Sequence, residues 1–126
     1  MFGATGAMSV FGWNCQGMGG SLGSPKMLHL QRLIYSSKAQ VIVISETRNY
    51  KLSKTDLINR FNVNNAHVVP ANGLLGGMWL LFNYDVDVEV LESSPNFLFC
   101  MCDHKLLHKK FCLVCVYGDP IIKELN

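Results

Sequence analysis

The chain has few charged residues for its size. Charged residues make up 16% of its 126 residues, against roughly 25% in typical soluble domains. A formal net charge of +2 is too small to indicate a nucleic-acid partner by itself. No tail of one sign is present, and the one basic cluster lies in residues 105–110, beside histidines. With 49% hydrophobic residues, the sequence predicts one domain, or part of one, whose surface is short of charge, which a missing half or a partner would explain.

Long apolar runs and targeting signals are also lacking. The longest nearly apolar stretch, residues 73–82, is far too short to span a bilayer. The first basic residue is Lys26, so the start of the chain lacks the charged region of a signal peptide. Five cysteines, an odd number, have no spacing typical of a secreted disulfide framework. We therefore expect an intracellular protein, nuclear or cytoplasmic, with cysteines that act as small core residues.

The order of apolar and polar residues predicts an α/β fold. Residues 1–7 are small and Gly-rich, so we expect a disordered start. Ser24 and Pro25 suit a helix cap and first turn, and apolar residues then recur at spacings of three and four. Residues 41–45 form a continuous β-branched run, typical of a strand buried on both faces. The sequence predicts two helices, at 25–37 and from the Ser53 cap to Arg60. It predicts strands at 8–14, 41–45, 66–69, 78–82, 86–90, 97–102 and 111–117. The later strands are expected to form an antiparallel meander of four or five strands.

Two of these strands end in polar residues that suit metal and phosphate binding. The first ends at Asn14, and Glu46 directly follows the second. If the strands are neighbours, the amide and the carboxylate lie together at one end of a sheet. A single carboxylate can hold Mg²⁺ when a substrate phosphate and water complete the oxygen ligands. The alternative is that Glu46 only ends a strand at the surface.

Two other constellations are weaker. A strand, a glycine cluster and a helix suggest a dinucleotide site, but no glycine starts the required Gly-x-Gly-x-x-Gly spacing. A zinc site could be drawn from cysteines and histidines late in the chain. Their alternation within two apolar strands favours core cysteines instead. The members of this possible zinc set are Cys100, Cys102, Cys112, Cys115, His104 and His108.

Four short motifs resemble those of one known domain. Residues 13–19, Trp-Asn-Cys-Gln-Gly-Met-Gly, are similar to the Trp-Asn-Cys-Arg-Gly-Leu-Gly opening of the endonuclease domain of plant LINE-type (non-LTR) retrotransposons. Residues 45–48 resemble its Gln-Glu-Thr-Lys motif, and residues 76–78, with the strand after them, resemble its Gly-Gly-Leu segment. Residues 116–120 are similar to its Val-Tyr-Gly-x-Pro. The matches fall in family order across nearly the whole chain, which thus resembles the amino-terminal half of a domain of the endonuclease/exonuclease/phosphatase superfamily.

The resemblance implies a fold, a partner and roles for three residues. The fold would be the first half of a four-layered, DNase I-like α/β sandwich, with residues 1–126 as a partial domain whose second half is missing. Glu46 would bind Mg²⁺, Asn14 would organise the metal and the phosphate, and Tyr117 would lie beside the scissile phosphate of DNA. In the intact family the metal stabilises charge on the phosphate while an activated water attacks in line. Basic residues near Glu46, Arg48 and Lys51, would then contact phosphates, as could the loop at residues 105–110.

Two family motifs are not found in these 126 residues. Neither the Asp-x-Asn motif nor the terminal Asp-His pair is present, and Asp103-His104 lies too early in the chain to replace the latter. We therefore expect a fragment of a Mg²⁺-dependent nuclease that is inactive or only weakly active. We also expect one apolar face of the first sheet to stay uncovered, which favours self-association. The alternatives are a domesticated, non-enzymatic interaction protein and, less favoured, a zinc-binding module.

Overall fold

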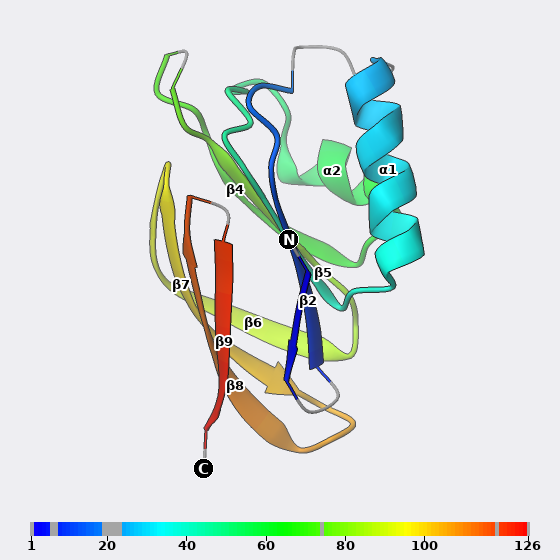
Figure 1. Cartoon of the computed structure of the whole chain (residues 1–126), viewed down its shortest axis with the longest axis vertical. Helices are drawn as coiled ribbons and strands as arrows, with labels where there is room; N and C mark the ends of the chain where they lie inside the picture. The colour runs from blue at the N-terminus through cyan, green and yellow to red at the C-terminus, as the bar shows by residue number, and fades with distance from the viewer. Residues whose placement is uncertain (1, 6–7, 19–23, 74, 118, 126) are drawn as a thin grey trace.

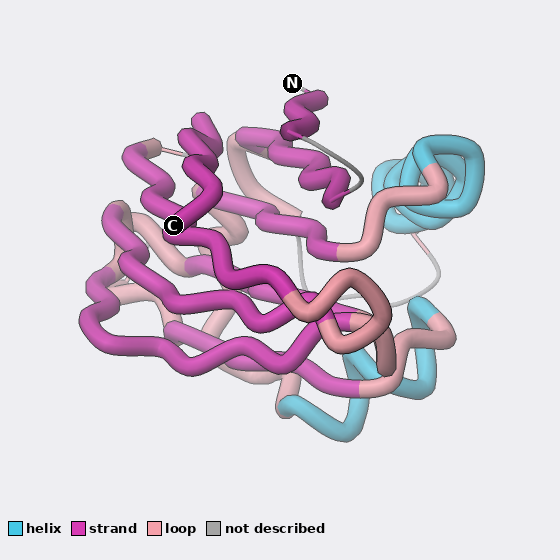
Figure 2. Tube along the Cα trace, turned by 90° about the horizontal axis from the view of Figure 1, so that it is seen from below, coloured by secondary structure: helices cyan, strands magenta, loops and turns pink. Residues whose placement is uncertain are grey.

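A computed structural model describes residues 2–5, 8–18, 24–73, 75–117 and 119–125. Over these residues the chain forms an α/β fold in three layers: two helices, a mixed five-stranded sheet and an antiparallel four-stranded sheet (Figure 1). Figure 2 shows both helices on the same side of the strands. The elements are β1 (Phe2–Thr5), β2 (Met8–Asn14), α1 (Pro25–Ser37), β3 (Val41–Ser45), α2 (Lys54–Phe61), β4 (Asn65–Val69), β5 (Met78–Phe82), β6 (Val86–Ser94), β7 (Phe97–His104), β8 (Lys109–Val116) and β9 (Asp119–Leu125).

The first sheet has the strand order β1-β2-β3-β5-β4. Its central pair, β2 and β3, is parallel, and their register runs from Val10 opposite Val41 to Asn14 opposite Ser45. A parallel pair needs a long crossover connection, which α1 supplies. The remaining pairs are antiparallel. The two strands that the sequence predicts to end in polar residues are therefore neighbours with the same direction.

Both helices begin at the caps that the sequence predicts. The Ser24 side chain accepts a hydrogen bond from the backbone N–H of Met27, and Pro25 lies in the first turn of α1. Ser53 and Asp56 form a capping box at the start of α2, in which each side chain accepts from the other residue's backbone N–H. Such caps satisfy orphan N–H groups and define where each helix starts.

Two cores separate the three layers. The helix-side core joins α1 and α2 to one face of the first sheet, and the inter-sheet core joins the other face to the second sheet. All five residues of β3 and of β5 are buried because these strands have a core on each side. The continuous apolar run at 41–45 is thus confirmed as a strand buried on both faces. The inter-sheet core contains Cys100, Cys102 and Cys115, as expected for core cysteines.

The second sheet is an antiparallel meander in the order β6-β7-β8-β9. It corrects the expectation that a face of the first sheet is uncovered, because the chain turns at residues 83–85 and the meander folds back over that face. The outer face of the second sheet carries exposed apolar side chains, among them Val116 and Ile121. The sequence analysis did not predict β9. Its residues are only exposed or half-buried, and the strand forms by pairing with β8.

The chain start also differs from expectation. β1 covers Phe2–Thr5 of the segment expected to be disordered, and it pairs antiparallel with β2, from Phe2 opposite Phe11 to Thr5 opposite Met8. Backbone pairing with an available strand edge accounts for this, since it needs little from the side chains. Met1, Gly6 and Ala7 lie outside the described residues. No helix in the described part of the chain is long and apolar enough to cross a membrane.

Candidate active site

Asn14 and Glu46 lie at the same edge of the first sheet. Asn14 is opposite Ser45 in the parallel β2–β3 pair, and Glu46 is the next residue after β3. The Asn14 side-chain oxygen accepts a hydrogen bond from the backbone N–H of Gln16 at 3.2 Å, which holds the turn after β2. The Glu46 side chain is 18% exposed. The carboxylate is thus partly withdrawn from solvent at the carboxyl ends of two parallel strands.

The backbone around Glu46 is held on both sides. On one side, the N–H groups of Gly17 and Met18 donate to the carbonyls of Glu46 and Thr47 at 2.7 and 2.8 Å. On the other side, Thr47 and Arg48 donate to the carbonyls of Gly77 and Gly76 at 3.2 and 2.8 Å. Glu46 itself has φ 54°, a left-handed conformation that costs a non-glycine residue energy. The surrounding hydrogen bonds hold this strained conformation, which sets the direction of the carboxylate.

Two glycines allow the third motif to pack against the second. A Cβ on Gly77 would lie 2.3 Å from the Thr47 hydroxyl oxygen, and one on Gly76 would lie 2.4 Å from Pro95 Cβ. Both glycines also have positive φ, +94° and +72°. The Gly76–Gly77 turn therefore fits between the Glu46 segment and the β6–β7 hairpin only without side chains.

Asn96 connects Glu46 to Tyr117. With its amide oriented so that the nitrogen faces acceptors, Asn96 donates to Glu46 Oε1 at 3.0 Å and to the Pro95 carbonyl at 3.1 Å. The backbone carbonyl of Asn96 accepts a hydrogen bond from the backbone N–H of Tyr117 at 3.0 Å. Tyr117 has φ 52° and is 60% exposed, so its ring is open to a ligand. The hairpin of the second sheet thus brings Tyr117 to the edge where Glu46 lies.

Sequence reasoning missed Asn96. Pro95-Asn96 has the composition of an ordinary hairpin turn, and it is the packing of the second sheet on the first that brings this turn against Glu46. The one available signal was the position of Asn96 just before β7, which leads into β8 and so to the fourth motif at residues 116–120.

A model of the endonuclease/exonuclease/phosphatase family matches residues 12–121, a span that contains Asn14, Glu46 and Tyr117. The chain belongs to this family. Membership identifies the superfamily as one of phosphodiesterase-type hydrolases. A comparison with curated proteins gives no match.

Basic side chains border the sheet edge where Glu46 lies. Arg48 Nε lies 3.5 Å from Glu46 Oε2, and its half-exposed side chain packs beside Gly17. Lys26 Nζ donates to the carbonyls of Cys15 and Gly17, each at 2.6 Å. These two cations give the loop after β2 a positive side that suits a phosphate.

The second basic loop, at residues 105–110, lies at the opposite end of the second sheet. Lys105 follows the carboxyl end of β7 and pairs with Asp87, whereas Asn96 precedes the start of β7. Lys109 pairs with Glu124 at the same far end. At about 3.3 Å per residue, the length of β7 separates the two ends by roughly 20 Å. The same distance keeps Asp103-His104 away from Glu46, and His104 is buried, with Nε2 2.8 Å from Gln40 Nε2.

Glu46 is the carboxylate at this edge that a divalent metal ion could use. The family generally uses a divalent metal, yet the described residues include no group of three His, Cys, Asp or Glu side chains that could hold one. Glu46 contributes one carboxylate, and its oxygens already contact Arg48 and Asn96. Mg²⁺ is often held by one carboxylate together with phosphate oxygens and waters. We conclude that Glu46 and the Asn14 amide could hold such an ion weakly, with a phosphate present.

The cysteines do not form a zinc site in the described structure. Cys100, Cys102 and Cys115 are buried in the inter-sheet core, whereas Cys112 lies on the other face of β8 and is partly exposed. Burial raises the pKa of both Cys102 and Cys115 to about 12. Since zinc binds thiolates, these protonated core thiols are poor ligands.

Proposed function

We propose that this chain binds the phosphodiester backbone of DNA at the Glu46 edge, as a Mg²⁺-dependent relative of LINE-type retrotransposon endonucleases. The observation that supports this most is that four segments far apart in the sequence meet at the sheet edge where Glu46 lies. They are the loop after β2, residues 46–48, the Gly76–Gly77 turn and the Asn96–Tyr117 contact.

Each residue has a role in this proposal. Glu46, with the Asn14 amide, would hold the ion, and a bound Mg²⁺ stabilises negative charge on a phosphate oxygen. Arg48 lies close enough to Glu46 for a phosphate to bridge its guanidinium and the ion. The exposed Tyr117 hydroxyl can donate a hydrogen bond to the same phosphate. Asn96 positions Glu46 and the backbone of Tyr117.

We further propose that these 126 residues bind DNA without efficient cleavage. In-line attack needs a group that activates water, and neither family motif that supplies such carboxylates and a histidine occurs in the sequence. Asp103-His104 lies at the far end of β7 and His104 is buried, so it is no substitute.

The test compares Glu46→Gln with the matched control Glu124→Gln. Both replace a carboxylate that contacts a cation, but Glu124 pairs with Lys109 at the opposite end of the second sheet. Fluorescence anisotropy of a labelled DNA duplex, with and without Mg²⁺, should show that Mg²⁺ strengthens binding by the wild type and by Glu124→Gln but not by Glu46→Gln. Equal Mg²⁺ dependence in all three proteins would contradict the proposed site.

Cleavage is tested separately, with supercoiled plasmid and Mg²⁺. We expect no more nicking by the wild type than by Glu46→Gln. Robust nicking that Glu46→Gln abolishes would refute the proposed lack of turnover while supporting the site.

A second candidate function is a non-enzymatic interaction protein. The outer face of the second sheet carries the cross-strand neighbours Phe99, Val114 and Ile121, the last of which is 64% exposed. Exposed apolar patches on a sheet favour association. If this face mediates self-association, light scattering should show a concentration-dependent dimer that Ile121→Lys weakens. A monomer at all concentrations would exclude this candidate.

A further inference from the structure

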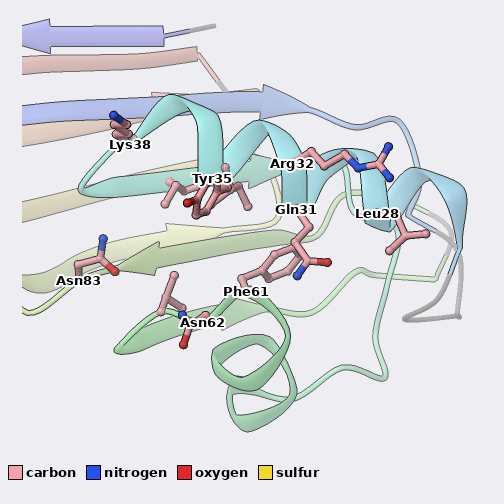
Figure 3. Close-up of a pocket in the computed structure, with 12 residues that line it drawn as sticks. Leu28, Gln31, Arg32, Tyr35, Lys38, Phe61, Asn62 and Asn83 are labelled. Atoms are coloured by element: carbon pink, nitrogen blue, oxygen red, sulfur yellow. The ribbon is translucent and has the colours of Figure 1, made fainter.

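A groove separates α1 from the end of α2 on the helix side of the first sheet (Figure 3). Its volume is about 620 Å³, within the range of small-molecule sites, roughly 300–1,000 Å³. Buried apolar side chains line its depth, among them Ile34, Ile42 and Phe61. Figure 3 shows Gln31 and Tyr35 extending from α1 on the side that faces Phe61. The groove is thus a hollow with an apolar floor between two helices.

The charge of the groove has one sign. Among the described residues that line it, Arg32 and Lys38 are charged and none carries a carboxylate. The two cations are six residues apart in and just after α1, which corresponds to about 9 Å along a helix axis. The lining favours an anionic ligand, because an anion at the rim would meet one of these cations and no carboxylate of the described lining.

The rim also carries aromatic and amide groups with unused binding capacity. Tyr35 is 85% exposed although its ring borders the groove. The side-chain amides of Gln31, Asn62 and Asn83 make no hydrogen bond to another described residue of the chain. An exposed ring offers a stacking surface, and amides can both donate to and accept from a heteroaromatic ring.

We propose that this groove binds a planar aromatic anion, the class that nucleoside monophosphates represent. The aromatic ring of the ligand stacks on Tyr35 and enters toward Phe61. The phosphate contacts Arg32 or Lys38 at the rim, and the amides bond the ring heteroatoms. Such a ligand combines in one molecule the flat apolar part and the negative charge for which the groove has partners.

This site is separate from the Glu46 edge. Ile42 lies near the amino end of β3 and Asn83 just follows β5, whose end is paired with the start of β3. Glu46 follows the other end of β3, more than about 10 Å away at 3.3 Å per residue. The groove therefore binds its ligand whether or not DNA binds at Glu46.

The experiment titrates the full chain with AMP and follows backbone amide shifts by NMR. We expect saturable shifts at Tyr35, Lys38 and Asn62, and binding of adenosine or of inorganic phosphate that is weaker by about tenfold or more, because each lacks one of the two contacts. The double variant Arg32→Glu/Lys38→Glu should weaken AMP binding by at least as much. Tyr35→Ala, at an exposed position, should weaken it several-fold.

The control is Lys110→Glu/Lys123→Glu, which changes the net charge equally but lies on the second sheet. It should leave AMP affinity unchanged. The proposal is overturned if AMP causes no saturable shifts at millimolar concentration, or shifts residues around Glu46 instead. It is also overturned if pyrophosphate binds as tightly as AMP, since the groove would then be a plain anion site.

Discussion

Replacing Gly77 with alanine should destabilise the chain strongly. The new Cβ would lie 2.3 Å from Thr47 Oγ1 and 3.3 Å from the nearest atoms of Ala71, at φ +94°. The left-handed backbone costs an alanine about 1–2 kcal/mol, and overpacking against a held neighbour costs about 1–3 kcal/mol more. We therefore expect the free energy of unfolding to fall by about 2–5 kcal/mol, a large part of the roughly 5–15 kcal/mol typical of native proteins.

Gly73→Ala is the matched control. Gly73 also has positive φ, +64°, but a Cβ there would meet nothing within 4 Å. This variant should lose only the backbone part, about 1–2 kcal/mol. Urea denaturation followed by circular dichroism measures both losses, and the difference between them gives the cost of the collision with Thr47 and Ala71.

A double-mutant cycle then tests the assigned cause. Thr47→Ala removes the atom that the new Cβ would meet, so Gly77→Ala should cost distinctly less in that background than in the wild type. The reasoning is refuted if Gly77→Ala is as stable as Gly73→Ala, or if its cost is the same with and without the Thr47 side chain.

The remaining predictions concern the cysteines and the Ser53–Asp56 capping box at the start of α2. Burial raises the pKa of Cys102 and Cys115 to about 12, from an ordinary value of 9.0, so the folded chain keeps protons that the unfolded chain releases. Stability should be unaffected below about pH 9 and should fall as the pH rises from there toward 12, as a shift in the urea midpoint; a flat profile would contradict this. Iodoacetamide should label partly exposed Cys112 in the folded chain and the four buried thiols, those of Cys15, Cys100, Cys102 and Cys115, only after unfolding, as peptide mass analysis would show. Ser53→Ala should lower the free energy of unfolding by about 1 kcal/mol. The backbone N–H and the hydroxyl of Ser53 both donate to Asp56 and hold its pKa low, so loss of the hydroxyl should raise that pKa part of the way toward its usual value; an unchanged NMR titration of Asp56 would contradict the side-chain hydrogen bond.

The helices and strands that were predicted correctly are those that a local sequence pattern determines. The apolar spacing after Ser24 sets the buried face of α1, at Met27, Leu30 and Ile34. The β-branched run at 41–45 could be buried on both faces only in the middle of a layered fold. These patterns depend on neighbours in the chain, so they can be read before any tertiary contact is known.

The elements that were missed depend on partners elsewhere in the fold. β1 and β9 have weak patterns of their own and form because the edges of β2 and β8 are available. A face of the first sheet was predicted to be uncovered, and this was wrong, because a strand pattern shows that one side is apolar but not which layer covers it. The direction in which the meander folds is decided at residues 83–85, where the chain passes from one sheet to the other.

The sequence by itself determined that Asn14 and Glu46 end two strands, and the family motifs predicted that they share a site with Tyr117. Only the tertiary structure decided how that site is assembled. The contacts of Asn96 with Glu46 and Tyr117, and the tight fit of Gly77 against Thr47, join segments that lie far apart in the chain. Such contacts follow from the register and packing of two sheets, which depend on the whole set of buried side chains rather than on any one segment.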